Sequence, residues 1–181
     1  MAKVQVSNVK FVENPCCFDS PFQFEVTLEC IAELHEELKW KMIYVGSSGS
    51  EYFDQVLETI VVGPVLAGSH IFVFKPDPPD ANQIPDLDIV GTTIVQLTCS
   101  YRGQQFVHIG YFINSYYTDQ EMDENPPPQP LFDTFKRNIL STKLRMKLFD
   151  INLDDASTSS GLPNENGVAH VMSMEVDNTA Q

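Results

Sequence analysis

The chain has 181 residues, with 25 acidic and 11 basic side chains and a formal net charge of −14. This length suits one domain followed by a tail, and the charge disfavours direct binding to DNA or RNA, which needs a clustered basic face. An acidic surface favours cationic partners, although solubility is the commoner role of such charge.

The first predicted strand lies at the N-terminus, where Val4 and Val6 alternate with polar residues. No charged-then-apolar leader precedes it, and no window reaches the roughly 18 apolar residues of a membrane span. We therefore expect a soluble, intracellular protein. The turn-rich run ENPCCFDSP (13–21) interrupts the chain, and PFQFEVTLEC (21–30) then alternates apolar and polar residues throughout. That alternation predicts a half-buried strand.

Further strands are predicted in WKMIYVG (40–46), VLETIVVG (56–63) and SHIFVFK (69–75), which Gly, Ser, Pro and Asp clusters separate. Two short stretches have a helical pattern, residues 32–38 and 133–140. Many short strands at roughly ten-residue spacing are typical of a two-sheet antiparallel β-sandwich. We expect an all-β fold of this kind, with short helices confined to loops.

The segment GTTIVQLTCSYRGQQFVHIGYFIN (91–114) predicts a β-hairpin. A two-residue turn would need a positive φ at Arg102, so we expect a three-residue loop, Tyr101-Arg102-Gly103, with the positive φ at Gly103. This register places Val95, Leu97 and Cys99 on a core face with Val107, Ile109 and Tyr111. Apolar residues then interrupt the opposite, polar face at Ile94, Phe106 and Phe112. Such a patch is either covered by another part of the chain or marks a partner site.

The last predicted strand is KLRMKLFDI (143–151), and the character of the sequence changes after it. From about Asp155 the chain has no lysine, no arginine and no periodic apolar pattern, so we expect a disordered polar, acidic tail over 155–181. The folded domain is then predicted to span 1–154. Residues 157–160 are Ser or Thr and offer phosphate acceptors, or they are simply part of a solvated tail.

Residues with reactive side chains are scattered and form no recognisable catalytic motif. We interpret the four cysteines, Cys16, Cys17, Cys30 and Cys99, as small buried apolar groups. Cys30, Trp40 and Cys99 imitate immunoglobulin spacing, but a reducing compartment and Leu97 in place of the expected tyrosine argue against that disulfide. No glycine-rich phosphate loop, metal-ligand spacing or nucleophile motif is present. We predict no enzymatic activity, no cofactor and no metal site.

Several segments closely resemble the anti-silencing-function histone chaperone family, and the resemblance is collinear from Met1 to about Asn152. They are MAKVQVSNVKFVENP, PFQFEVTLEC, WKMIYVGS, DQVLETIVVGPVLAG, VGTTIVQLTCSYRGQQF and NPPPQP followed by RNIL. The resemblance implies an immunoglobulin-like sandwich and a nuclear, ATP-independent chaperone, monomeric when free. Such a chaperone binds a histone H3–H4 dimer, blocks H3–H4 tetramer formation and passes histones to assembly chaperones. The alternative is a general immunoglobulin-like adaptor that binds basic peptides.

The resemblance implies a groove for the C-terminal helix of histone H3. Ile94 would be its apolar anchor, widened by Phe112, while Asp54 and Asp88 would meet basic side chains. The implied H3 contacts are Val45, Asp54, Asp88, Thr92, Ile94, Gln96, His108, Phe112 and Arg145. The family usually has an aliphatic residue at the position of Gln96 and an arginine at that of His108, so the ionic contacts of the rim are expected to be rearranged. His108 is either a pH-sensitive contact or a neutral surface histidine.

Two further sites follow from the same resemblance. The tail of histone H4 would pair as an added strand with the last strand of the domain. The implied H4 residues are Leu97, Tyr111, Leu144, Met146, Lys147 and Phe149. A basic-apolar peptide of a downstream assembly chaperone would bind at an acidic strand edge, unless that edge merely deters aggregation. Its implied residues are Glu36, Glu37, Leu38, Glu58, Thr59, Ile60, Val61, Val62 and Phe72.

Overall fold

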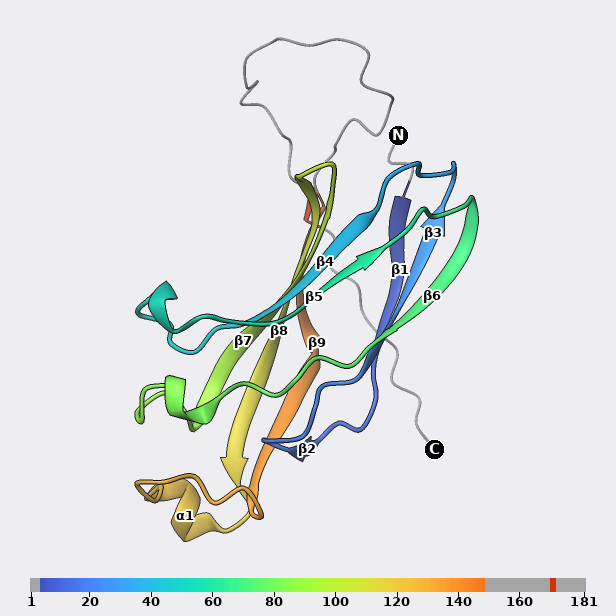
Figure 1. Cartoon of the computed structure of the whole chain (residues 1–181). Coiled ribbons are helices and arrows are strands. Elements are labelled where there is room, and N and C mark those ends of the chain that lie inside the picture. Colours follow the sequence, from blue (N-terminus) through green and yellow to red (C-terminus); the bar gives the residue numbers. More distant parts are fainter. Residues whose placement is uncertain (1–3, 149–169, 172–181) are drawn as a thin grey trace.

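A computed structural model of the chain describes residues 4–148 and 170–171 (Figure 1). Antiparallel strands form two sheets, one in the order β1-β3-β6 and one in the order β10-β9-β8-β7-β4-β5, with β2 paired to β9. The strands are β1 (Val4–Phe11), β2 (Cys16–Cys17), β3 (Phe24–Cys30), β4 (Leu38–Tyr44), β5 (Gln55–Val62), β6 (Gly68–Phe74), β7 (Gly91–Tyr101), β8 (Gln104–Tyr117), β9 (Phe135–Leu148) and β10 (His170–Val171). Helical turns are η1 (Glu51–Phe53), η2 (Ala81–Gln83) and α1 (Gln120–Glu124).

The core lies between the two sheets, which Figure 1 shows as two layers. Alternation along β3 buries Phe24, Val26 and Leu28, and these side chains face the larger sheet. Aromatic contacts join the layers: the Phe74 ring lies 5.1 Å from that of Phe24 and 5.8 Å from that of Trp40, centroid to centroid. Burial of such rings supplies much of the free energy of folding. The predicted all-β sandwich is confirmed.

The two predicted helices are wrong. In 32–37 the chain is irregular, and residue 38 begins β4. Leu34 forms an isolated bridge with Val65, in which its N–H donates to the Val65 carbonyl at 2.8 Å. In 133–140 most of the segment belongs to β9, where Phe135, Arg137 and Ile139 are buried with period two. Pairing with β8 satisfies this backbone, so tertiary contacts override a weak local preference.

The turn between β7 and β8 also differs from the prediction. Arg102 and Gly103 both have positive φ, 50° and 77°, and Tyr101 pairs with Gln104, so the turn has two residues. Arg102 also forms an ion pair in this conformation, in which its Nε lies 2.8 Å from Glu36 Oε1. A bulge next to the turn makes Phe106 an extra residue of β8 and buries it to 4% exposure. The bulge restores the predicted facing of the remaining strand pair, while Phe106 joins the core.

The cysteine interpretation is confirmed in part. All four thiols are free, and Cys30 and Cys99 are buried, where desolvation raises the pKa of each. Cys16 and Cys17 are only half-buried, and Lys136 Nζ donates to the Cys17 sulfur at 2.9 Å. Over the part of the chain that the structure describes, no helix is long and apolar enough to cross a membrane. The same residues contain no group of three or more His, Cys, Asp or Glu that would hold a metal ion.

Candidate functional site

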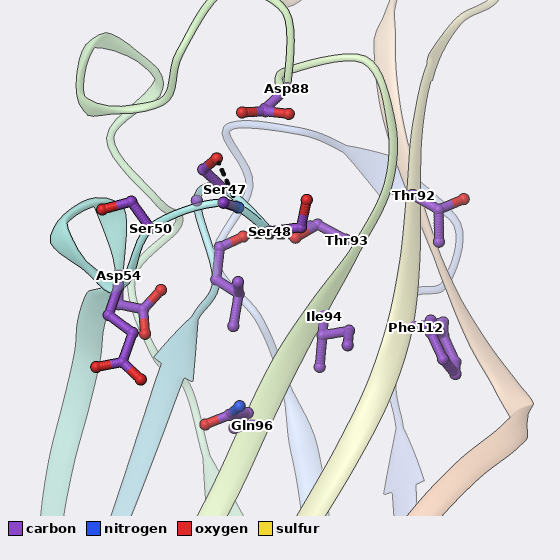
Figure 2. A pocket seen from close by; sticks show the side chains of 14 residues that line it. Ser47, Ser48, Ser50, Asp54, Asp88, Thr92, Thr93, Ile94, Gln96 and Phe112 are labelled. Atoms are coloured by element: carbon purple, nitrogen blue, oxygen red, sulfur yellow. Dashed lines mark hydrogen bonds between the residues drawn. The ribbon is translucent and has the colours of Figure 1, made fainter.

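A groove of about 560 Å³ lies where β7, the end of β4 and the loop before η1 meet (Figure 2). It brings together Val45, Asp54, Asp88, Thr92, Ile94, Gln96 and Phe112 of the predicted H3 contacts. Its other lining residues are Gly46, Ser47, Ser48, Gly49, Ser50, Glu51 and Thr93. None of this second set was predicted as a contact, since in the sequence the run SSGS (47–50) indicates only a turn.

The apolar centre of the groove follows from the alternation of β7. Val95 and Leu97 are buried, so Ile94 and Gln96, which alternate with them, face outward. Ile94 pairs directly with Phe112 on β8, and Figure 2 shows the two side chains on neighbouring strands. Both are half-buried and present an apolar surface. The chain therefore leaves an apolar pair on the face that alternation assigns to solvent.

The wall of the groove is held by backbone contacts from β4 and the following loop. The Val45 N–H donates to the Ile94 carbonyl at 2.9 Å, and the Thr93 hydroxyl donates to the Val45 carbonyl. Gly46 allows a close approach, since a Cβ at this position would lie 2.3 Å from the Phe53 carbonyl oxygen. These contacts bring η1, and with it Asp54, to the rim.

The electrostatics of the rim centre on Asp54. Its Oδ1 is buried and has no hydrogen-bond partner among the described residues. Desolvation, and then the charge of Glu51, raise the pKa of the Asp54 carboxyl above its usual value. A buried carboxylate oxygen without a donor is costly, and a cationic or N–H group of a ligand would relieve that cost. Asp88 adds a further carboxylate to the same groove (Figure 2).

The remaining predicted H3 residues lie outside the groove lining. His108 lies on the outward face of β8, paired with Thr98, on the same face as Gly110 and Phe112. The backbone of Arg145 on β9 pairs with Gly110, which places it next to the strand that carries Phe112. His108 therefore continues the outward face of β8 beyond Phe112, and the backbone of Arg145 lies on the neighbouring strand.

The predicted H4 residues do not form one surface. Leu97 and Tyr111 are core residues with 3% exposure each, and Tyr111 packs edge-on against Phe11. These two side chains therefore pack in the core and are not accessible to a partner. Leu144, Met146 and Lys147 belong to β9, whose backbone follows β8 in antiparallel pairing. Phe149 lies outside the described residues.

The predicted acidic strand edge follows β5, which has β4 on one side and no other strand partner among the described residues. Glu58, Thr59, Ile60, Val61 and Val62 lie along it. Glu36 and Glu37 come close to its far end, because the Glu37 Cα lies 2.9 Å from where a Cβ of Gly63 would be. Leu38 is fully buried and Phe72 is half-buried on β6, so Leu38 belongs to the core and not to a surface groove.

Comparisons with known proteins show the family to which the sequence is similar. A family model described as ASF1 like histone chaperone matches residues 1–154. The histone chaperone asf1 of Drosophila melanogaster is 55% identical over 182 residues, covering 100% of this chain and 84% of that protein. Histone chaperone asf1b of Xenopus tropicalis is 52% identical, with 87% and 78% covered, and ASF1B of Homo sapiens is 50% identical, with 86% and 77% covered.

Proposed function

The chain belongs to the ASF1-like histone chaperone family, and on that premise we propose that its groove binds the H3–H4 dimer through a helix of histone H3. The observation that carries this proposal is the combination of the apolar pair Ile94–Phe112 with the buried, unpartnered oxygen of Asp54. A helix with an apolar stripe and a basic residue fits such a groove. Covering that helix would block the H3–H4 tetramer.

The net charge supports the same partner class. Histones are basic, and a chain with a formal charge of −14 would attract them over long range and raise the encounter rate. We propose further that the H4 tail pairs with the outer edge of β9, and that β5 receives a basic-apolar peptide of an assembly chaperone. The protein would then act in the nucleus as a monomeric carrier in nucleosome assembly and disassembly.

The experiment that tests the proposal is size-exclusion chromatography of the full chain with an H3–H4 dimer in high salt. We expect a stoichiometric complex, because apolar burial at Ile94 and Phe112 is insensitive to screening. A general adaptor for basic peptides predicts weak binding that is lost at high salt and shows no preference for H3–H4. Absence of a complex in high salt, with binding only in low salt, would favour the adaptor.

Asp54→Asn is expected to stabilise the free protein slightly and to weaken its complex with H3–H4. The raised pKa means that the folded state disfavours the charged carboxylate. This cost is fully present above the folded pKa and is relieved as pH falls through it, so a neutral side chain removes it at pH 7. The same change removes the partner of a histone cation.

Urea unfolding of the free protein and a binding titration with H3–H4 measure these two opposite effects. Asp77→Asn is the control, because Asp77 is exposed and outside the groove lining. A variant of Asp54 that binds H3–H4 as tightly as the wild type would remove this carboxylate from the interface.

Glu58→Lys is expected to weaken binding of a basic assembly-chaperone peptide by about tenfold or more. The new lysine would lie at the edge of β5 and would repel the basic residues of the peptide. Binding of H3–H4 in the groove should be unchanged. Pull-down of the assembly chaperone, with H3–H4 binding measured in parallel, tests both. Glu25→Lys on β3 of the other sheet serves as the matched charge reversal. Equal loss in both variants would point to net charge and not to a site.

A further inference from the structure

The outer edge of β9 is closed near its start by the N-terminal part of the chain. Lys136 and Arg137 pair with the two residues of β2. The Asn14 side chain then binds the backbone of Ile139 as a strand would: its Oδ1 accepts from the Ile139 N–H at 2.8 Å, and its Nδ2 donates to the Ile139 carbonyl at 2.8 Å. An edge strand exposes unpaired backbone groups, and folded proteins commonly cover them. This part of the edge is covered from within the chain.

The far end of the same edge is also paired. In β10, His170 pairs with Leu148 and Val171 pairs with Lys147, in antiparallel orientation. On the other side of β9, Leu148 and Lys147 pair with Val107 and His108 of β8, so at this point β9 has a strand on each side. The two residues of β10 lie within the run VAHVM (168–172), in a C-terminal region that is otherwise mostly polar or acidic. Valine is among the residues that favour strands.

We propose that His170–Val171 of the same chain occupies the outer edge of β9, and that an incoming strand must displace this segment to pair with Lys147 and Leu148. One backbone edge accepts one strand at a time. A segment of the same chain competes at an effective concentration that an external strand has to overcome. The identity of the incoming strand as the H4 tail rests on the proposed function, whereas the occupancy itself does not. The β10 segment would thus partly inhibit binding of the histone at this edge.

Amide hydrogen exchange of the full chain tests the occupancy without any histone. Successive residues of an antiparallel strand alternate between positions that do and do not hydrogen-bond to the partner strand. Both residues of β10 are therefore replaced by proline, which has no N–H to donate, in the double variant His170→Pro, Val171→Pro. We expect faster exchange at whichever amide of Lys147 and Leu148 points away from β8, by about two- to tenfold for each hydrogen bond lost. The control, Asn178→Pro with Thr179→Pro, lies in the same C-terminal region beyond β10 and should leave these amides unchanged.

Unchanged exchange in the His170→Pro, Val171→Pro variant would overturn the occupancy. Protection that falls on dilution of the wild type would show a strand from a second copy and would overturn the intramolecular assignment. A titration with the H3–H4 dimer then tests displacement: the double-proline variant should bind about two- to tenfold more tightly than the control. Equal affinities would contradict displacement. If neither variant binds H3–H4 while exchange still differs, the occupancy stands and the proposed function fails.

Discussion

Ile94→Arg is expected to abolish the complex with H3–H4. Ile94 lies at the centre of the groove beside Phe112, and an apolar helix docked there would bury the new guanidinium without a partner. An uncompensated buried charge costs about 3 kcal/mol or more, which corresponds to a loss of affinity of more than about a hundredfold. The free protein should remain folded, because Ile94 is only half-buried before the partner docks and a long side chain can extend into solvent.

Size-exclusion chromatography in high salt, with a parallel urea unfolding curve, measures this result. Ile71→Arg is the matched control: Ile71 is an exposed isoleucine at 65% exposure, on β6 of the smaller sheet. It adds the same charge to the same fold away from the groove, so its complex should persist. A folded Ile94→Arg protein that still elutes with H3–H4 would disprove the groove assignment.

Arg137→Ala is expected to lower the free energy of unfolding by about 3 kcal/mol, as for other large buried side chains. Arg137 is 1% exposed, its Nη1 donates to the Phe18 carbonyl at 2.6 Å, and its guanidinium carbon lies 3.7 Å from the centroid of the Phe22 ring. Truncation would open a cavity under β2 and leave the Phe18 carbonyl without that donor. Burial lowers the pKa of this guanidinium, but an arginine stays charged in proteins.

Arg137→Met separates the packing of this side chain from its charge. Methionine refills much of the volume and removes the cost of burying a cation, so we expect its stability to lie within about 1 kcal/mol of the wild type. Urea unfolding of the three proteins gives the comparison. If Arg137→Met loses as much stability as Arg137→Ala, the hydrogen bond and the ring contact outweigh the packing. H3–H4 binding should be unaffected in both, since Arg137 lies outside the groove lining.

The strands and the outward face of the hairpin could be predicted from the sequence, because both depend on a period of two that neighbouring residues define. That period alone placed Ile94, Gln96 and Phe112 on one face and Val95 with Leu97 on the other, as the structure has them. These faces are predicted correctly although the predicted turn at Arg102 is wrong, because the bulge at Phe106 returns the following residues of β8 to their predicted faces. The family resemblance added which of these outward residues form a groove.

Other features of the molecule depend on contacts between residues far apart in the chain. An ion pair with Glu36 accompanies the turn conformation of Arg102, and the strand at 135–140 depends on pairing with β8. The buried oxygen of Asp54 depends on the loop that Gly46 lets approach. The desolvation of a side chain and the covering of a strand edge arise only when distant segments pack together, so no local sequence pattern predicts them. The alternation of residues along each strand assigns its side chains to a face, and packing between distant segments decides which residues on that face are available to a partner.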